Sequence, residues 1–290
     1  RWMHDQTMRW ANHGYNATEI AEMLVLPPEL AAHAHTTGYY GHLAHNVKAV
    51  FQRYLSWYDG NPANLWKLPP VQAGQRYVEL AGGADALLVA ARRAFDAGDY
   101  RWVAELVNHL VFAEPDNTGA RELQADALEQ IGYQTESSTF RNAFLSGAQE
   151  LRNGCMPRTP AGRSGYLEAM TPAQFFDTLA VRLRAEDVGG VQVAVNLTFT
   201  DLDQQWVLGL DHRALHAIPG RHEPSAVCTL TGPKAVLHRV LETAPFAQSV
   251  AAAVGDGTLV VDGSVAAAEP LFANLDTFLT NFPLVEPKPS

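Results

Sequence analysis

The segment Asn153-Gly154-Cys155-Met156-Pro157-Arg158-Thr159-Pro160-Ala161-Gly162-Arg163-Ser164-Gly165 separates two parts of this 290-residue chain that differ in hydrophobic pattern. Its prolines and glycines are interspersed with polar residues, a composition typical of a connection between domains. We therefore predict a first domain over residues 1–153, a linker over 154–165 and a second domain over 166–290.

The part before this linker has the pattern of an all-α domain. Asn16-Ala17-Thr18-Glu19 places an N-cap residue three positions before a glutamate, and apolar residues follow at helical spacing. A longer helix is predicted over about 40–58. Its apolar face is formed by Val47, Val50, Phe51, Tyr54 and Leu55.

Further along the chain, Gly98 and Gly132 stand 34 residues apart and are expected to interrupt helices. This period is similar to that of tetratricopeptide helix pairs. One or two such pairs cannot cover their own apolar faces, so they need neighbouring helices or a second subunit. The first domain is therefore predicted to be all-α and tetratricopeptide-like.

The part after the linker alternates between strand and helix patterns. Strands are predicted where β-branched residues alternate with others, at 191–199, 205–210, 226–230 and 258–263. Helices are predicted at 171–185, 234–241 and 266–282. A few mostly antiparallel strands with flanking helices indicate a compact α+β domain.

Composition narrows the class of protein. The chain carries 31 acidic and 21 basic residues, a net charge of −10, and an acidic chain repels nucleic acid. The same charge argues against a transcription regulator, although residues 16–30 resemble the opening of a helix-turn-helix. The sequence contains no run of 18 apolar residues, so no transmembrane segment is predicted. It leaves open the cellular location and whether Cys155 and Cys228 pair.

Aromatic, imidazole, amide and cationic side chains are concentrated in the run Gly38-Tyr39-Tyr40-Gly41-His42-Leu43-Ala44-His45-Asn46-Val47-Lys48. Such mixtures usually mark a place where a polar ligand or a metal is bound beside apolar material. His42 and His45 are three residues apart near an expected helix start, so both rings can lie on one helix face. This spacing is compatible with metal ligation, but a capping or hydrogen-bonded histidine explains it more simply.

Several motifs in the same order resemble those of one family. They are the run from Gly38 to Leu65, Tyr77-Val78-Glu79-Leu80-Ala81-Gly82-Gly83-Ala84-Asp85, Gly98-Asp99-Tyr100-Arg101-Trp102-Val103-Ala104-Glu105, Ala113-Glu114-Pro115-Asp116-Asn117 and Ala148-Gln149-Glu150-Leu151-Arg152-Asn153-Gly154. Over nearly its whole length the chain resembles the alkyl sulfatases of the metallo-β-lactamase superfamily. In that family an N-terminal domain binds two zinc ions, a helical domain forms dimers, and a C-terminal domain is similar to sterol carrier proteins.

The resemblance implies that residues 1–153 form the helical dimerisation domain, with the tail of the catalytic region at its start. Residues 166–290 are then the sterol-carrier-like domain. The zinc motif His-x-His-x-Asp-His of the family occurs nowhere in this sequence. Arg1 follows no initiator methionine or signal-peptide pattern. The chain is therefore expected to be part of a longer zinc enzyme and to be inactive alone.

The resemblance also assigns candidate site residues. The family's Ser/Ala-His-Asn triplet matches Ala44-His45-Asn46, which implies that His45 completes the zinc site of the intact enzyme. Tyr39, Tyr40 and Asn46 are candidates for binding the substrate, since they offer neutral donors to a sulfate group. Lys48 offers a cation, although packing of its helix explains it more simply. No residue of this part alone is expected to be catalytic.

Aromatic residues outside this run have a simpler interpretation. A place in the core is predicted, with an alkyl channel as the alternative, for Trp57, Tyr58, Trp66 and Trp102. The apolar strands at 191–199 and 226–230 are a second place where an alkyl chain can be expected to bind.

These observations favour the C-terminal portion of a zinc-dependent alkyl sulfatase that hydrolyses long-chain primary alkyl sulfates to alcohol and sulfate. This portion is expected to form a homodimer, to bind the alkyl chain of an alkyl sulfate or another amphiphile, and to supply one zinc ligand. The alternative is a non-catalytic, dimeric protein that binds alkyl chains or lipids.

Overall fold

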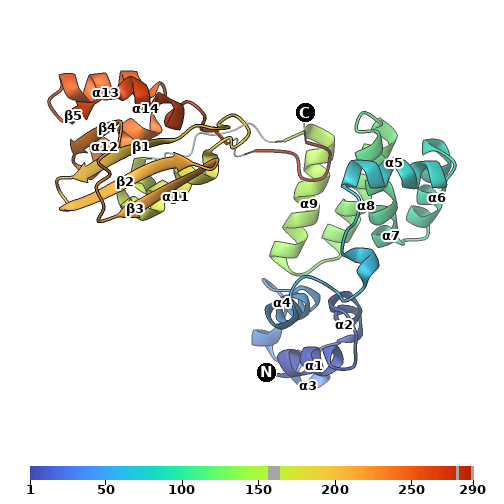
Figure 1. Cartoon of the computed structure of the whole chain (residues 1–290). Helices are drawn as coiled ribbons and strands as arrows, with labels where there is room; N and C mark the ends of the chain where they lie inside the picture. The colour runs from blue at the N-terminus through green and yellow to red at the C-terminus, as the bar shows by residue number, and fades with distance from the viewer. Residues whose placement is uncertain (156–163, 279–280, 289–290) are drawn as a thin grey trace. The chain divides into compact units, whose positions relative to one another are not determined.

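The computed structural model describes residues 1–155, 164–278 and 281–288. The chain forms two compact units. The helical unit consists of the residues up to 155 together with residues 281–288, and the sheet unit consists of residues 164–278. Figure 1 shows the helices of the first unit and the strands of the second. Of the predicted linker, residues 156–163 lie outside the described residues.

The first part of the helical unit is formed by α1 (Trp2–Ala11), α2 (Ala17–Met23), α3 (Pro28–Ala31), η1 (Ala34–Thr36), α4 (Leu43–Leu55) and η2 (Pro62–Asn64). As predicted, α2 begins with a capping box. Asn16 Oδ1 accepts from the Glu19 N–H, and the Glu19 carboxylate accepts from the Asn16 N–H. A small core between these helices is formed by Ile20, Ala21, Leu24, Val47 and Phe51.

Helix α4 is shorter than the predicted helix over 40–58. His42 caps its start through its side chain, and the helix ends at Leu55 because the C-cap residue Ser56 has a positive φ of 75°. Tyr54 and Leu55, which were predicted on the apolar face, are 57% and 45% exposed. The buried stripe of α4 is therefore limited to its first three turns.

Longer helices form the rest of this unit, namely α5 (Pro70–Leu80), α6 (Ala84–Asp96), α7 (Tyr100–Ala113), α8 (Thr118–Tyr133) and α9 (Ser138–Asn153). Helix α5 packs on α7, α7 on α8 and α8 on α9. Their shared core includes the fully buried residues Leu87, Val103, Val107, Leu110 and Leu123. The all-α class predicted for this part of the chain is confirmed.

The two glycines of the predicted repeat have different roles. Gly98 lies between α6 and α7 with a φ of +80°, as expected where one helix ends and the next begins. Gly132 is the second-last residue of α8, so this helix ends at the predicted place. An added Cβ at Gly132 would be 2.9 Å from Leu145 Cδ2 on α9, so the lack of a side chain also serves close helix packing.

The C-terminal segment 281–288 packs on the helical unit. One carboxylate oxygen of Glu150 on α9 accepts from the backbone N–H groups of Leu284 and Val285, at 2.6 and 2.9 Å. Arg121 of α8 forms a half-buried ion pair with Glu286. The Val285 side chain packs against the core of this unit. The end of the chain is thus part of the helical fold.

The sheet unit contains α10 (Ser164–Ala169), α11 (Pro172–Arg182), β1 (Val193–Phe199), β2 (Gln204–Asp211), β3 (Ala214–Pro219), β4 (Cys228–Gly232), α12 (Lys234–Glu242), α13 (Phe246–Gly255), β5 (Val260–Gly263) and α14 (Val265–Phe272). The strands form one sheet in the order β3-β2-β1-β4-β5. The β1–β4 pair is parallel and the other pairs are antiparallel. The predicted α+β class with mostly antiparallel strands is confirmed.

One face of the sheet builds the core of this unit. Val195 and Leu197 of β1 and Leu208 of β2 are fully buried on that face, together with residues of the helices α11, α12 and α14. The opposite face carries the alternate residues of the strands, among them Asn196 and His216. The core-facing apolar side chains of β1 and β4 are packed against these helices.

Several elements differ from the prediction. Strand β3 was not predicted because its hairpin turn with β2 uses His212 and Arg213, both at positive φ, where a sequence signal would be asparagine and glycine. Helix α13 was not predicted either, and α14 ends at Phe272 rather than near residue 282. Among the described residues, none of the helices combines the length and the apolar character that crossing a membrane requires.

The prediction of a core position is wrong for the tryptophans. The exposed fractions of Trp57, Trp66 and Trp102 are 68%, 96% and 49%. Tyr58 is half-buried. These aromatic rings therefore belong to the surface of the helical unit.

Candidate functional site

The loop with the two adjacent tyrosines is held by its backbone. The Tyr39 carbonyl accepts from the backbone N–H of Ser138 at 2.7 Å, at the start of α9. The Tyr40 carbonyl accepts from Ser137 Oγ at 2.8 Å and from Thr139 Oγ1 at 2.5 Å. These bonds satisfy groups at the N-terminus of α9 and fix the segment that leads into α4.

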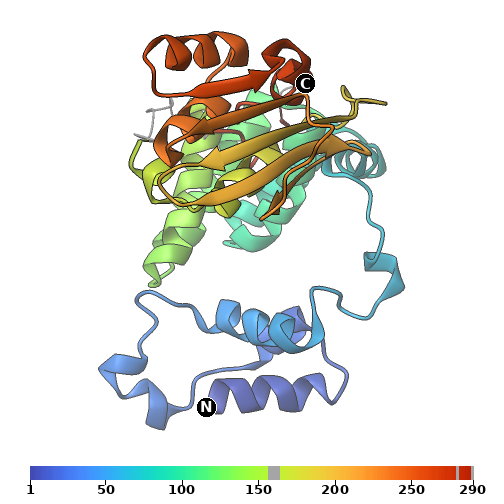
Figure 2. The ribbon, with the colours of Figure 1, turned by 60° about the vertical axis from the view of Figure 1, so that its left-hand side comes forward.

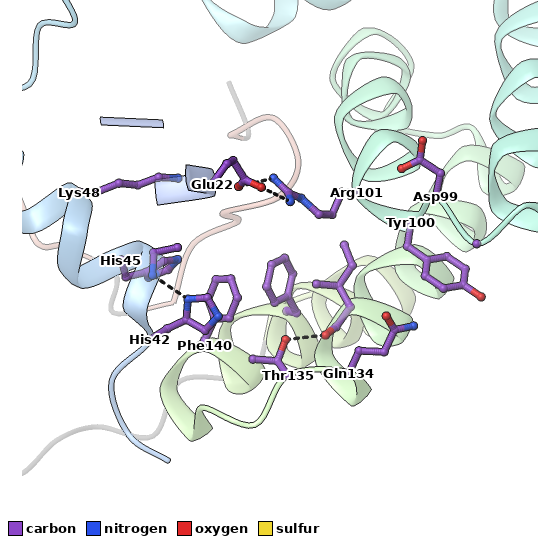
Figure 3. A pocket seen from close by; sticks show the side chains of 14 residues that line it. Glu22, His42, His45, Lys48, Asp99, Tyr100, Arg101, Gln134, Thr135 and Phe140 are labelled. Atoms are coloured by element: carbon purple, nitrogen blue, oxygen red, sulfur yellow. Dashed lines mark hydrogen bonds and ion pairs between the residues drawn. The ribbon is translucent and has the colours of Figure 1, made fainter. Parts of the chain in front are cut away.

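His42 and His45 then follow on one side of the first turn of α4. His42 Nδ1 accepts from the backbone N–H of Ala44 at 3.3 Å, so His42 is the N-cap of the helix. The two imidazole rings lie 5.7 Å apart, and both contact Phe140 of α9, at 4.5 and 4.3 Å between ring centroids. Phe140 therefore supports both rings (Figure 3).

The protonation of His45 is biased toward the neutral form. Partial burial against its neighbours lowers the pKa of His45 below its ordinary value, and the nearby His42 and Lys48 lower it further. His45 nonetheless keeps more than a third of its surface exposed. At neutral pH the ring is thus an accessible neutral imidazole, the form in which histidine binds a metal.

Both histidines line a cavity of about 570 Å³ in the helical unit. Its walls come from α2, the first turns of α4, the α6–α7 connection, the end of α8 and the start of α9. The lining residues include Glu22, His42, His45, Lys48, Asp99, Tyr100, Arg101, Gln134, Thr135 and Phe140. Figure 3 shows them converging from these different helices.

An ion pair closes one side of this cavity. The Arg101 guanidinium donates to both carboxylate oxygens of Glu22, at 3.0 and 2.9 Å. The hydrogen bond from Arg101 lowers the pKa of Glu22, and the charge of Lys48 contributes to the same shift. Because both side chains of the pair are more than half exposed, the pair adds about 1 kcal/mol or less to stability. Its effect is to fix the position of Arg101.

Of the four predicted site residues, one lines this cavity and three do not. His45 faces the cavity, whereas Tyr39, Tyr40 and Asn46 do not line it. The tyrosine side chains are 59% and 77% exposed, and the Asn46 amide lies against Gly41. The sequence reasoning did not single out Glu22, Arg101 or Phe140 as site residues. Arg101 lies in the quoted Gly98–Glu105 motif, but only the fold brings it opposite His45.

The donors for a metal are incomplete in this chain. Among residues 1–155, 164–278 and 281–288, no group of three or more His, Cys, Asp and Glu side chains can hold a metal ion. A catalytic zinc needs three protein ligands and an open position. The exposed, neutral ring of His45 fits such a centre only as one contributed ligand.

Two family descriptions match the chain. The family described as alkyl sulfatase dimerisation matches residues 16–154, and the family described as alkyl sulfatase C-terminal matches residues 160–287. The chain consists of the dimerisation and C-terminal domains of the alkyl sulfatase family. Together the two matched regions cover most of both units.

Individual relatives agree with this assignment. Over 99% of the chain, identity is 44% to a linear primary-alkylsulfatase from Pseudomonas sp., 44% to the alkyl/aryl-sulfatase BDS1 of Saccharomyces cerevisiae, and 43% to an (R)-specific secondary-alkylsulfatase from Pseudomonas sp.. The solved structure of the stereoselective inverting sec-alkylsulfatase Pisa1 from Pseudomonas sp. superposes with a TM-score of 0.92 at 42% identity, and covers 99% of this chain and 45% of that one. The chain spans 42–44% of the lengths of the three sequence relatives.

Proposed function

We propose that this chain is the C-terminal part of a zinc-dependent alkyl sulfatase that hydrolyses long-chain primary alkyl sulfates to the alcohol and sulfate. The observation that carries this proposal is the identity of 43–44% to alkylsulfatases over 99% of the chain. The position of His45, neutral and facing a cavity, agrees with a share in the metal site of the whole enzyme.

In this proposal, His45 is one ligand of a two-zinc centre whose other ligands lie outside this chain. Bound zinc supplies a nucleophilic water or hydroxide at neutral pH and draws charge from the sulfate oxygens. His42 positions the first turn of α4 as its N-cap, and Phe140 packs against the ring of His45. These two residues orient the ligand but do not bind the metal.

Tyr39, Tyr40 and Asn46 are proposed to bind the sulfate group. The backbones of Tyr39 and Tyr40 are anchored to α9, while the tyrosine side chains stay accessible. Hydroxyl and amide donors that are held in place stabilise an oxyanion more effectively than mobile ones. Lys48, which lines the cavity together with His45, adds a positive charge there.

The preference for primary substrates is the part of the proposal that the relatives support least. The primary, the alkyl/aryl and the secondary alkylsulfatases are all 43–44% identical to this chain.

The helical unit is proposed to form a homodimer, in agreement with its family description. The sheet unit is proposed to bind the alkyl chain of the amphiphile.

The test requires the protein with whatever in-frame sequence precedes Arg1. We expect it to bind zinc, measured by elemental mass spectrometry, and to release sulfate from dodecyl sulfate. His45→Ala should lower the zinc content below that of the wild type and lower activity about 100-fold, while His42→Ala, one turn away and also against Phe140, should retain zinc. If the protein binds dodecyl chains but does not bind zinc and does not hydrolyse the ester, the proposal is wrong and the alternative, a non-catalytic alkyl-chain-binding dimer, takes its place.

A further inference from the structure

Helix α5 and the segment before it expose an apolar surface on the helical unit. We call the residues Trp66, Leu68, Tyr77 and Leu80 the α5 face. Their exposed fractions are 96%, 43%, 51% and 82%. They surround one shallow hollow of about 820 Å³ with Lys67, Arg76 and His109 at its edges. Figure 2 shows the connection that runs from α4 through η2 to α5. Trp66 and Leu68 lie in this connection, between η2 and α5.

The α5 face gathers the exposed apolar surface of four side chains around one hollow. From the exposed fractions, the four side chains leave on the order of 500 Å² of apolar surface in contact with water. A patch of this size is in the range of the largest apolar patch on a typical monomer, and such patches are often functional. A stable protein–protein interface buries about 800 Å² on each partner, so the α5 face would make up most of one.

Helix α5 beneath Tyr77 and Leu80 is firmly held. Gly74 brings α5 so close to α7 that an added Cβ would clash with the His109 carbonyl oxygen. Tyr77 stacks on His109 at 4.1 Å between ring centroids. Burial lowers the pKa of His109, so its ring is neutral when stacked. Tryptophan, tyrosine and arginine, which this surface presents, are enriched among the residues that dominate the binding energy of interfaces.

We infer that the α5 face is the centre of the contact between two copies of this chain. This inference rests on the proposed dimerisation, since the family description of residues 16–154 names that property but no surface. The residues that line the hollow carry no carboxylate, although the chain has a net charge of −10. The α5 face therefore lacks the excess of negative charge through which two acidic copies repel each other.

The helix also offers a complementary pair of charges. Arg76 and Glu79 are both exposed and less than one turn apart. In a two-fold antiparallel pairing of α5 helices centred between Tyr77 and Val78, Arg76 of one copy lies opposite Glu79 of the partner subunit. Such pairs set the orientation of packed helices.

Sedimentation equilibrium of the 290-residue chain tests the inference. We expect a dimer whose dissociation constant rises at least 100-fold in Leu80→Glu and in Trp66→Ser. Val89→Glu, an equally drastic change at a 54% exposed position of α6, serves as the matched control and should leave the dimer intact. Because Leu80 and Trp66 are exposed, circular dichroism should be unchanged in both variants.

The possible outcomes separate this inference from the proposal beneath it. A wild-type chain that stays monomeric at all concentrations would overturn the proposed dimerisation itself. A wild-type dimer that Leu80→Glu and Trp66→Ser leave intact would place the contact elsewhere and overturn only the role of the α5 face. Arg76→Glu should weaken the dimer and Arg76→Glu combined with Glu79→Arg should restore it; without that rescue, the antiparallel pairing is wrong.

Discussion

Replacing Gly74 by alanine should destabilise the helical unit, against the ordinary preference of helices for alanine. Gly74 lies inside α5, where alanine would stabilise an isolated helix by about 1 kcal/mol relative to glycine. In this fold, however, the new methyl group would clash with the carbonyl oxygen of His109 and would also lie 3.2 Å from the Ala113 nitrogen. Both neighbours are backbone atoms of α7, which no rotamer change can move aside.

The size of the effect follows from this geometry. A close C···O contact is about 3.3 Å, so α5 has to retreat from α7 by on the order of 1 Å. Overpacking of this kind costs up to about 3 kcal/mol, which leaves a net loss of about 2 kcal/mol after the helix preference is counted. Because m-values in urea are about 2 kcal/mol per molar, the unfolding midpoint should fall by roughly 1 M.

Urea titration of the whole chain, followed by circular dichroism at 222 nm, measures this shift. Gly119→Ala is the matched control, because Gly119 is exposed near the start of α8 and an added Cβ meets its nearest atoms only at 3.6 and 3.7 Å. That variant should be neutral or slightly more stable. If Gly74→Ala has a midpoint equal to or above that of the wild type, the close α5–α7 contact described above is refuted.

Three further predictions concern other parts of the chain. In NMR titrations His45 should lose its proton below the ordinary histidine pKa of 6.5, and Lys48→Met should move the pKa of His45 upward. Because folding disfavours the protonated ring, the neutral ring's contribution to stability is fully present above pH 6.5 and declines as the pH falls through the lowered pKa. A pKa above 6.5 in the wild type would contradict the burial assigned to the ring. Glu150→Ala should speed hydrogen exchange of the Leu284 and Val285 amides at least tenfold, because both donate to that carboxylate; unchanged protection would mean that the tail is held by other contacts. Cys228, which is buried with a pKa raised to about 11, should react with iodoacetamide only after unfolding, whereas the half-buried thiol Cys155 should be labelled in the folded chain; peptide mass spectrometry distinguishes the two.

Sequence patterns predicted the elements whose signals are local. The capping box at Asn16 and the alternation of residues 191–199 depend on neighbouring residues only, and both predictions are confirmed. The role of Gly132 and the hairpin at His212–Arg213 depend on contacts between distant segments or on rare backbone conformations. The positions of the tryptophans were mispredicted for a related reason, since apolar character alone cannot distinguish a core from an uncovered surface.

The candidate site shows the same division. The run from Gly38 to Lys48 drew attention to His45 because its residue types are unusual together. Phe140 and Arg101 are 95 and 56 residues further along the chain, and only the packing of α9 and the α6–α7 connection brings them to the same cavity. Tyr39 and Tyr40 were chosen for their hydroxyls, yet their backbone carbonyls make the contacts that shape the site.

The return of residues 281–288 to α9 has a consequence for biosynthesis. The Glu150 carboxylate accepts from Leu284 and Val285, and the Arg121 guanidinium, which also donates to the Pro115 and Leu151 carbonyls, pairs with Glu286. A ribosome that adds 5–20 residues per second needs roughly 10 s to proceed from α9 to these residues. During that interval the sheet unit emerges and can fold, while the helical unit waits for its final segment. Of these two units, the one whose synthesis starts first is therefore the one completed last.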